Sequence, residues 1–349
     1  MDSRILAVGF GEPPSPDPEA VKTYLERIFL ENMPIEGEMP AEAAKARASE
    51  LADRRLPGLI AEYEEIGGSP LGEHLKGHAE RLRMELDARG ITADIEVATQ
   101  FFEPTIEEVV NAAGEDQIEQ LIVLPMYPLC GPSTTVASIA TVADAIEAFD
   151  GWHPTLIPIG GWHRHPRYNR LRANHLASTV SERGIDLADP EVALIFSAHG
   201  TPIHYLDEGS RYDQYVEEYC EVQARLLDID SYSLGYQNHE ARGVEWTEPS
   251  IEEVIETIDA RHVVVEPVSF IHEQSETLSE LDIELAEEAS AVGLEFDRVP
   301  VPHDDPAMAG VFADLVEPAL VGFDDGYYGF RGCQCASTPG TRCLCAPFN

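Results

Sequence analysis

The sequence predicts an α/β protein of two similar doubly wound domains, each a parallel sheet with helices on both faces. Short apolar runs typical of buried strands alternate with amphipathic helical segments. The same order of segments also occurs twice along the chain. With 349 residues, of which 44% are hydrophobic, the chain is long enough for two cores of ordinary size.

The internal repeat is clearest around two similar heptapeptides. Residues 103–109, Glu-Pro-Thr-Ile-Glu-Glu-Val, recur at residues 248–254 as Glu-Pro-Ser-Ile-Glu-Glu-Val. In each copy a Thr or Ser precedes a Glu by three positions, which is the capping-box pattern of a helix start. A buried-strand run that ends in proline follows each copy, at Leu121–Pro125 and at Val263–Pro267. The two halves are therefore expected to share one topology.

Each half is expected to contain four strands. The first strand of each half closes on Gly-x-Pro, at residues 11–13 and 200–202. The other expected strands lie near residues 94–98, 155–159, 231–236 and 295–299. We place the first domain at residues 1–155, the second at 156–320 and a cysteine-rich tail at 321–349, with the ligand cleft between the two domains.

Residues suited to metal and proton chemistry follow two strands of the second half. His199, within Phe-Ser-Ala-His-Gly at 196–200, comes just after an apolar strand run. Glu276 begins a helical segment in which Glu280 and Glu284 follow at i+4 and i+8. At about 3.6 residues per turn the three carboxylates share one face, where like charges repel by about 0.2–0.5 kcal/mol per pair. A row that works against helix stability is suited to carrying a cation or protons.

The predicted topology brings His199 and Glu276 together. In a doubly wound sheet of strand order 2-1-3-4, ligands bind at the carboxyl ends of the first and third strands. His199 follows the first strand of the second half, and Glu276 follows the third. Imidazole can accept a proton near neutral pH because its ordinary pKa is about 6.5. Imidazole together with carboxylate is a common ligand set for divalent transition metals. His199 and Glu276 are the predicted catalytic and metal-binding pair.

The charge of the chain is extreme, with a formal net value of -41. Such a surface repels nucleic acid and anionic membranes, and its self-repulsion costs stability unless salt screens it. We therefore expect a salt-requiring protein from a high-salt cytoplasm, with an ordinary acidic protein as the alternative. No stretch approaches the roughly 20 apolar residues of a membrane span, and the first residues lack a secretory signal. The expected location is the cytoplasm, although apolar lips around a ligand cleft would allow contact with a membrane surface.

Six short strings follow one another in an order typical of one enzyme family. They are Ile-Gly-Gly-Ser-Pro-Leu (66–71), Leu-Pro-Met-Tyr-Pro (124–128), Ser-Thr-Thr (133–135), Ser-Ala-His-Gly (197–200), Tyr-Gln (236–237) and Glu-Thr-Leu-Ser-Glu-Leu-Asp-Ile-Glu (276–284). From about Ile5 to about Leu320 the chain resembles the ferrochelatases, which insert iron(II) into a porphyrin. The resemblance implies two Rossmann-like domains, His199 as the acceptor of pyrrole protons and Glu276 facing it across the ring. It also implies that Glu280 and Glu284 form a conduit behind Glu276.

Several positions depart from the pattern of the family near the helix of Glu276. Ferrochelatases often have histidine two residues before this glutamate, where the present chain has Gln274. His272 either substitutes for that histidine or packs against the end of the strand. These two alternatives carry equal weight in the sequence.

The residues expected to receive the porphyrin also differ. Asn32 stands where the family commonly has an arginine for the propionates, and Arg27 is the nearest cation. Phe10 is expected either to stack on the ring or to belong to the core. The predicted polar contacts near the lip are Tyr127, Ser133 and Thr134. Because bidentate arginine–carboxylate pairs are missing, the number of acid groups on the tetrapyrrole stays open.

The tail contains four cysteines within a short span. These are Cys333, Cys335, Cys343 and Cys345. Four thiols can hold a [2Fe–2S] cluster or a zinc ion, and an unligated, redox-active tail is the third alternative. Some ferrochelatases carry a [2Fe–2S] cluster on a C-terminal extension, and some use a cysteine from the body of the protein, near whose position Cys130 lies. Cys220 falls in a helical stretch and is expected in the core.

The resemblance implies an enzyme that makes haem from iron(II) and either protoporphyrin IX or coproporphyrin III. One alternative is a related chelatase that loads cobalt or iron into sirohydrochlorin. A second is a non-catalytic carrier of haem or porphyrin. The expected partners are the porphyrin and ferrous iron, with no nucleic acid, and the sequence makes no prediction of oligomeric state.

Overall fold

The first half of the chain folds around a four-stranded parallel sheet. In the computed structural model, residues 2–33, 37, 39–238, 243–322, 329–336 and 338–345 are described. The strands are β1 (Ser3–Gly9), β2 (Asp94–Thr99), β3 (Gln120–Pro125) and β4 (Thr155–Pro158). Their order is β2-β1-β3-β4, and each pair is parallel. β4 therefore belongs to the first sheet and continues beyond residue 155, where the first domain was expected to end.

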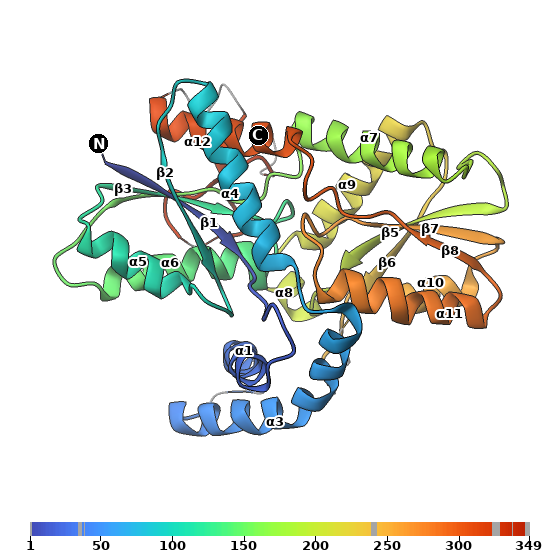
Figure 1. Cartoon of the computed structure of the whole chain (residues 1–349), viewed down its shortest axis with the longest axis horizontal. Helices are drawn as coiled ribbons and strands as arrows, with labels where there is room; N and C mark the ends of the chain where they lie inside the picture. Colours follow the sequence, from blue (N-terminus) through green and yellow to red (C-terminus); the bar gives the residue numbers. More distant parts are fainter. Residues whose placement is uncertain are drawn as a thin grey trace.

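The second half repeats this sheet. Its strands are β5 (Val192–His199), β6 (Ser233–Gln237), β7 (His262–Pro267) and β8 (Glu295–Arg298). Their order, β6-β5-β7-β8, is the same 2-1-3-4 order, and all pairs are again parallel (Figure 1). The central strands β3 and β7 are buried along their whole length. The predicted α/β fold class and strand order are confirmed.

Helices cover both faces of each sheet. In the first half these are α4 (Leu71–Ala88), α5 (Ile106–Glu115), the π-helix η1 (Pro132–Val136) and α6 (Ala137–Ala148). In the second half they are α7 (Pro166–Glu182), α8 (Ile203–Asp207), α9 (Tyr212–Leu227), α10 (Ile251–Thr257), the π-helix η2 (Glu276–Leu285), α11 (Ala286–Ala291) and α12 (Ala307–Val321). Thr105 and Ser250 begin α5 and α10 with complete capping boxes, as the repeated heptapeptides predict.

The helix that begins at Glu276 differs from the expectation. The spacing of its carboxylates predicts an α-helix, whereas η2 is a π-helix with i→i+5 hydrogen bonds. A four-residue spacing keeps side chains on one face in either form, so this pattern cannot distinguish the two. π-Helical turns are rare and are often found at functional sites.

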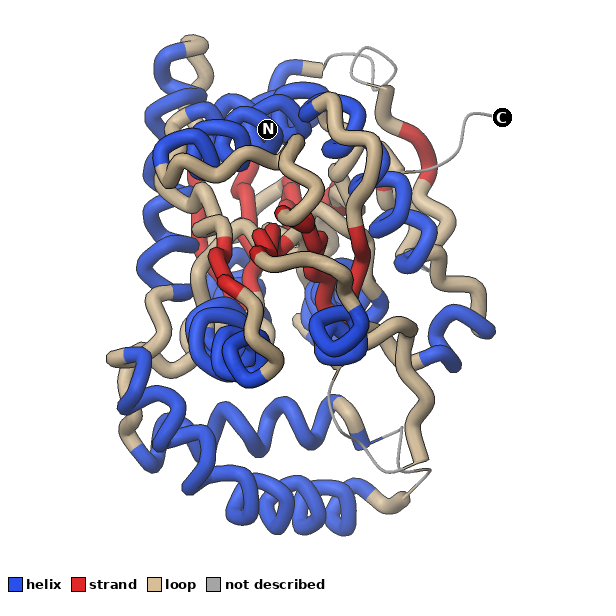
Figure 2. The backbone as a smooth tube through the Cα atoms, turned by 90° about the vertical axis from the view of Figure 1, so that its right-hand side faces the viewer, coloured by secondary structure: helices blue, strands red, loops and turns tan. Residues whose placement is uncertain are grey.

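Two helices form a separate layer beside the sheets. α1 (Pro18–Glu31) and α3 (Ala41–Ile66) pack against each other, apart from the two sheets (Figures 1 and 2). A small apolar cluster that includes Tyr24, Tyr63 and Phe101 holds them to the loops that follow β1 and β2. These helices are the structural candidates for the lip of a ligand site.

The last helix joins the two halves. α12 packs on α4 of the first half and on α7 of the second half. On the side of α4, Arg89 donates to Asp314 and to Glu317, each at 2.7 Å. Phe312 of α12 lies against the ring of Trp162 at a centroid distance of 5.7 Å. The main apolar core therefore runs continuously through both halves.

The cysteine tail docks on the edge of the first sheet. β9 (Arg331–Gly332) and β10 (Arg342–Cys343) form an antiparallel pair. Arg342 also bridges Ile159, just after β4, and Gly160 N–H donates to the carbonyl of Arg342 at 2.5 Å. Several residues of the predicted tail, 323–328, 337 and 346–349, lie outside the described residues.

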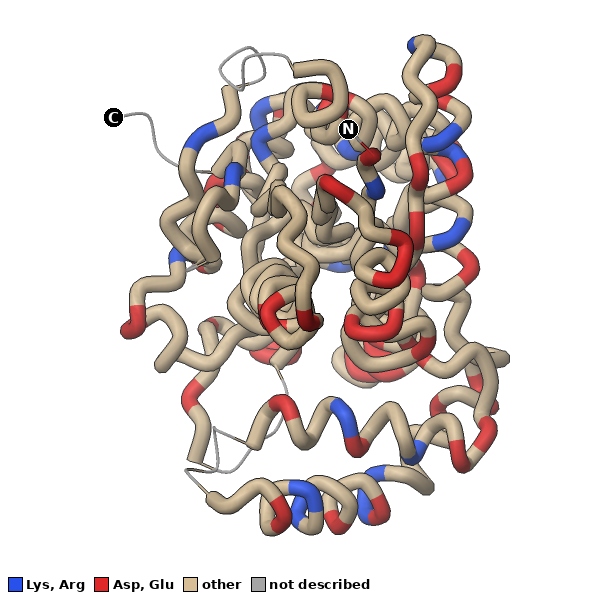
Figure 3. Tube along the Cα trace, turned by 90° about the vertical axis from the view of Figure 1, so that its left-hand side faces the viewer, with Lys and Arg blue, Asp and Glu red and all other residues tan. Residues whose placement is uncertain are grey.

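Acidic residues dominate the charged surface. Asp and Glu outnumber Lys and Arg by 64 to 23 in the chain, and Figure 3 shows this excess along the helices of the first half. Among the described residues, no helix combines the length and the apolar character that a membrane crossing needs.

Candidate active site

His199 is the last residue of β5, at the carboxyl end of the second sheet. Its backbone N–H donates to the Ser269 hydroxyl at 2.9 Å, and its carbonyl accepts the Tyr212 hydroxyl at 2.9 Å. Nδ1 lies 2.6 Å from the carbonyl of Gly200, to which it can only donate. This leaves Nε2 as the ring nitrogen available for chemistry.

Glu276 faces that nitrogen. Its Oε1 lies 3.1 Å from His199 Nε2, and both side chains are partly exposed, at 17% and 29%. Burial lowers the pKa of His199, but the Glu276 carboxylate outweighs this effect and raises the pKa to about 9. The pair therefore shares a proton at neutral pH. The sequence-predicted convergence of these two residues is what the structure shows.

Two buried ion pairs fix the segment that carries Glu276. Arg172 of α7 is fully buried, pairs with Glu266 of β7 and donates to the Phe270 carbonyl at 2.7 Å. Arg298 at the end of β8 donates to Glu273 at 3.0 Å and to Asp282 at 2.6 Å. These contacts hold the chain on both sides of Glu276, so the carboxylate has a defined position.

The other two carboxylates of the row lead from Glu276 toward the surface. Glu280 accepts a hydrogen bond from Gln237 Nε2 at 3.0 Å, and the same amide donates to the Glu276 carbonyl at 3.0 Å. Burial, followed by the nearby Glu276 charge, raises the pKa of Glu280 to about 8. Glu284 is exposed. The row thus runs from a half-buried pair to solvent.

Gln274 occupies the position at which the family often has histidine. It is 6% exposed, and its Nε2 donates to Glu276 Oε2. His272 lies edge-on against His78 of α4, with ring centroids 5.1 Å apart. Gln274 is therefore the residue that contacts the carboxylate, while His272 packs between the two halves.

The loops of the first half bring the predicted porphyrin contacts to the same end of the molecule. Tyr127 donates to Gln100 Oε1 at 2.8 Å, and Gln100 Nε2 donates to the Ser133 carbonyl at 3.1 Å. Burial and the charge of Glu276 raise the pKa of Tyr127 well above its ordinary value. Gln100 was not among the predicted site residues, because an amide after a strand has no distinctive sequence signal.

Thr134 lies in a loop that packs beside Tyr212. A Cβ at Gly131 would meet Thr134 Oγ1 at 2.7 Å and the Tyr212 ring at 3.7 Å. Since Tyr212 donates to the carbonyl of His199, the loop of Thr134 packs directly against the residue that supports the histidine.

Phe10 and Arg27 lie on the side of the lip helices. Phe10 is half-buried, and its ring packs on Phe101 at a centroid distance of 4.6 Å. Arg27 of α1 donates to the carbonyl of Phe101 at 3.4 Å and pairs with the exposed Glu103 at 3.4 Å. An exposed pair of this kind is worth little, so the guanidinium can exchange partners.

The cysteines form a second centre. Among the described residues, Cys130, Cys333 and Cys335 place their sulfur atoms within 4.8 Å of one another. Cys345 Sγ lies 3.1 Å from His163 Nδ1 instead. The four predicted ligands all lie in the tail, and the structure brings two of them, Cys333 and Cys335, to Cys130, the body cysteine to which the resemblance draws attention.

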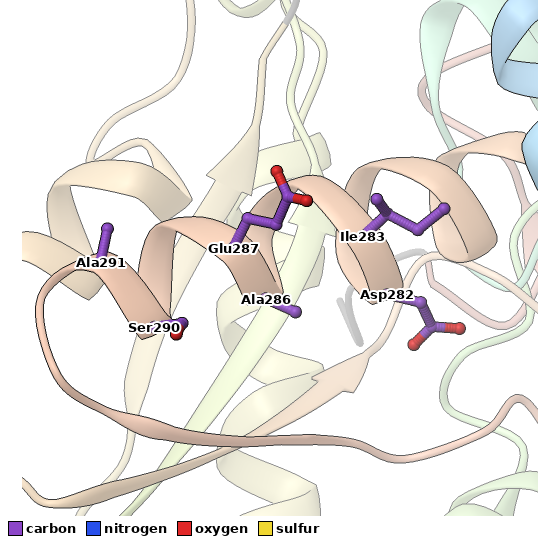
Figure 4. A pocket seen from close by; sticks show the side chains of 6 residues that line it. All are labelled: Asp282, Ile283, Ala286, Glu287, Ser290 and Ala291. Atoms are coloured by element: carbon purple, nitrogen blue, oxygen red, sulfur yellow. The ribbon is translucent and has the colours of Figure 1, made fainter.

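A shallow pocket on η2 and α11 belongs to neither centre. It is lined by Asp282, Ile283, Ala286, Glu287, Ser290 and Ala291 (Figure 4). The pocket has no imidazole or thiol among its lining residues, and it is open to solvent.

Known proteins resemble this chain over most of its length. The family model described as Ferrochelatase matches residues 3–320. A ferrochelatase of Nostoc punctiforme is 34% identical over 281 residues, covering 77% of this chain and 71% of the relative. One from Thermosynechococcus vestitus is 32% identical over 332 residues, covering 90% and 82%. The chain belongs to the ferrochelatase family.

The fold of a solved chelatase is also similar. CbiX, described as the terminal enzyme for biosynthesis of siroheme in denitrifying bacteria, matches with a TM-score of 0.50. The match covers 92% of this chain and all of that chain at 14% identity, which supports the two-domain fold alone.

Ferrochelatase activity follows from the family. The chain is an enzyme that inserts iron(II) into a porphyrin in haem biosynthesis, as the sequence predicts. The comparisons favour this activity over the sirohydrochlorin chelatase and the non-catalytic carrier. Porphyrin metallation releases two pyrrole protons, and the candidate site described above contains an imidazole and carboxylates that can accept protons.

Proposed function

We propose that His199 and Glu276 carry out the metal insertion of this ferrochelatase. Their 3.1 Å contact at the junction of the two halves is the observation on which this assignment rests. Iron(II) replaces the shared proton between imidazole and carboxylate, because a divalent cation stabilises the ionised carboxylate and the neutral imidazole. The neutral imidazole then accepts a pyrrole proton as iron enters the ring.

Glu280 and Glu284 serve as the conduit behind this pair. Glu280 can exchange protons near neutral pH because its pKa is about 8, while exposed Glu284 attracts cations from solvent. Each metallation moves one Fe²⁺ inward and two protons outward, and a row of carboxylates can carry both kinds of charge.

The porphyrin is proposed to lie against Phe10, with Tyr127, Ser133 and Thr134 near its rim. Phe10 supplies a flat apolar surface, and Arg27, which donates to the carbonyl of the neighbouring Phe101, is the proposed cation for a ring carboxylate. Protoporphyrin IX and coproporphyrin III differ in their number of carboxylates, so a comparison of the two substrates tests this contact.

The test is anaerobic metallation in molar KCl, followed by absorbance of the porphyrin. His199→Ala and Glu276→Ala are each expected to lower kcat by about 10²–10⁴, the usual contribution of a positioned acid or base. Porphyrin binding, measured by fluorescence quenching, should persist in both. Full turnover in either variant would remove that residue from the proposed pair. Comparing protoporphyrin IX with coproporphyrin III identifies the preferred substrate.

We also propose that the cysteines hold a [2Fe–2S] cluster. The donor set fits, because Cys130, Cys333 and Cys335 converge within 4.8 Å and iron–sulfur clusters are held by thiolates. Cys343 is the proposed fourth ligand, because its thiol lies within hydrogen-bonding reach of the Cys333 thiol. Cys345 is engaged by His163. When bound, the cluster would supply electron-transfer or redox-sensing chemistry and would tie the tail to the body.

Matched variants test the cluster. Cys130→Ser and Cys343→Ser should lose the visible absorbance, iron and sulfide of the purified protein, whereas Cys345→Ser should retain them. A colourless wild-type protein with about one zinc per chain would establish a structural zinc site instead. A protein that contains neither group would leave the tail unligated.

The acidic surface supports a function in concentrated salt. Repulsion within a net charge of -41 is reduced when salt shortens the Debye length from about 10 Å to about 3 Å. The unfolding midpoint should therefore rise markedly from dilute buffer to molar KCl. We propose a salt-rich cytoplasm as its location.

A further inference from the structure

Glu12 is a buried carboxylate that the metal-insertion chemistry does not use. It follows β1 in the Gly-Glu-Pro turn and is only 4% exposed. Its Oε2 accepts the Ser69 hydroxyl and the backbone N–H of Ser275, the latter at 3.2 Å, while Oε1 accepts the Ser275 hydroxyl. One carboxylate therefore joins the turn after β1, the start of α4 and the residue just before Glu276.

The partners of this carboxylate are neutral. Among the described residues it forms no ion pair, and Glu276, which carries a charge of the same sign, acts on it electrostatically. Burial raises the pKa of Glu12, although the three donors oppose this effect. A buried carboxylate without a cation is costly, and three hydrogen-bond donors offset part of this cost.

The glycine before Ser69 shows how closely these segments meet. Gly68 has φ of +93°, and a Cβ there would lie 2.1 Å from the carbonyl oxygen of Pro14. Only glycine lets the turn of Glu12 approach the start of α4 this closely. The Gly-Gly-Ser-Pro string thus places Ser69 against Glu12.

The turn itself does not need a carboxylate. The matching Gly-x-Pro turn of the second half has Thr201 at the same position, also 4% exposed. The backbone N–H of Thr201 donates to Thr247 Oγ1 at 3.1 Å. A neutral side chain therefore satisfies this turn geometry. Glu12 differs from Thr201 in that its side chain accepts a hydrogen bond from Ser275, 263 residues further along the chain.

We propose that Glu12 is a positioning residue for Glu276. By holding both the hydroxyl and the backbone N–H of Ser275, it sets where η2 begins and how the Glu276 carboxylate meets His199. It acts from the first half of the molecule on a carboxylate of the second half. The inference rests on the proposed role of Glu276 in metal insertion.

Four variants test the proposal. Glu12→Thr introduces the residue of the matching turn, Glu12→Gln keeps the size, and Ser275→Ala and Ser69→Ala each remove donors. Glu12→Thr and Ser275→Ala are expected to lower kcat by about tenfold or more, with the porphyrin KM nearly unchanged, as for other residues that orient a metal ligand. Glu12→Gln should retain part of the activity, and Ser69→Ala should have the smallest effect.

A structural role alone would give another pattern. In that case the variants would lower the unfolding midpoint, while kcat per porphyrin-binding site would stay at the wild-type value, and this result would overturn the proposal. Coupling gives a second criterion: Glu12→Thr and Ser275→Ala combined should cost no more than either change alone, whereas additive losses would contradict action through Ser275. If Glu276→Ala retained activity, the proposed function would fail. If only the Glu12 variants retained full kcat, this inference alone would fail.

Discussion

The two halves of the molecule share a framework but differ in the residues that they place at its functional end. Their backbones correspond closely: Met126 N–H donates to the carbonyl of Val8 at 2.8 Å, and Val268 N–H donates to that of Ser197 at 2.8 Å. This correspondence aligns the residue two positions after Val8, Phe10, with His199. The first half therefore has an aromatic ring where the second half has an imidazole.

The third strands give the same contrast. Each ends in a proline and is followed by a π-helix, η1 or η2. Thr134 stands nine positions after Pro125, as Glu276 does after Pro267. The first half thus supplies apolar and hydroxyl groups, while the second supplies titratable ones. In this ferrochelatase, a duplicated fold has one half suited to receiving a flat ring and the other suited to moving metal and protons.

Substitutions at the matched positions Phe10 and His199 should have the largest effects. His199→Phe introduces the residue type of the first half and should lower kcat by about 10²–10⁴, because it removes the base. Phe10→Leu should mainly raise the porphyrin KM, by a few-fold, because a smaller apolar surface remains. Steady-state metallation with separate iron and porphyrin titrations measures both. Equal losses of kcat in the two variants would contradict the division of roles.

The second prediction concerns the carboxylate behind Glu276. Glu280 has a pKa of about 8 in the folded protein, above the ordinary value of about 4.3. The native state therefore binds the proton more tightly, and the stability due to this group decreases as pH rises from about 4.3 toward 8. Glu280→Gln should raise the unfolding midpoint at neutral pH while lowering kcat by several-fold.

The matched position of the first half provides its control. Ser138 follows Thr134 by four residues, as Glu280 follows Glu276, and its hydroxyl donates to the carbonyl of Thr135 at 3.2 Å. Ser138→Ala should leave iron-dependent kinetics unchanged. A stabilising effect of Glu280→Gln with full activity would show that Glu280 is not part of the conduit.

A third prediction concerns the histidines between the halves. His74 stacks on His303 with centroids 3.5 Å apart, and His78 meets His272 at 5.1 Å. Burial and the nearby His303 lower the pKa of His74 to about 4. Burial and the nearby Arg81 lower the pKa of His78 to about 3. His74 and His78 are therefore neutral in the folded protein but titrate near 6.5 in the unfolded chain, so stability should fall as pH drops below about 6.5.

Acid unfolding followed by circular dichroism in molar KCl measures this loss. Glu273 and Asp304 also face His74, and their negative charges oppose the decrease of its pKa. His78→Phe keeps a ring against Phe312 while removing one titrating group, and it should make the pH dependence between 6.5 and 4 shallower. An unchanged slope would exclude His78 as a contributor.

The sequence predicts the fold and the main pair because both depend on local patterns. Strand runs and capping boxes occur in order along the chain, and the 2-1-3-4 order places the ends of the first and third strands together. His199 and Glu276 therefore meet whatever the details of the loops. The roles of Glu280 and Glu284 stay predictions for the experiments above.

Other features depend on contacts that no local pattern encodes. The π-helical form of η2 is not visible in a four-residue spacing, and the contact of Glu12 with Ser275 depends on how the halves dock. Cys130 joins Cys333 because the tail crosses the edge of the first sheet beside Gly160 and Gly161. Such pairings require the tertiary structure.

The smallest predicted effects are at the duplicated caps. Thr105 Oγ1 accepts the N–H of Glu108 at 3.3 Å, and Ser250 Oγ accepts that of Glu253 at 3.2 Å. Thr105→Ala and Ser250→Ala should each cost about 0.5–2 kcal/mol of unfolding free energy, because each leaves a helix N–H without its partner. Urea titration in molar KCl measures this cost.

Kinetics of the same two variants test whether the two halves respond differently to a loosened cap. Each cap follows a proline whose carbonyl accepts the N–H of a strand-end residue, Thr99 at 2.9 Å in the first half and Tyr236 at 3.0 Å in the second. Tyr236 precedes Gln237, which holds Glu276 and Glu280, whereas Thr99 precedes Gln100 at the rim. If the framework is rigid, neither variant changes kcat. A loss of kcat in Ser250→Ala alone would instead mean that small backbone shifts at this cap reach Glu276 and Glu280 through Gln237. The positions of the proposed catalytic residues would then depend on the framework more closely than those of the rim residues in the first half.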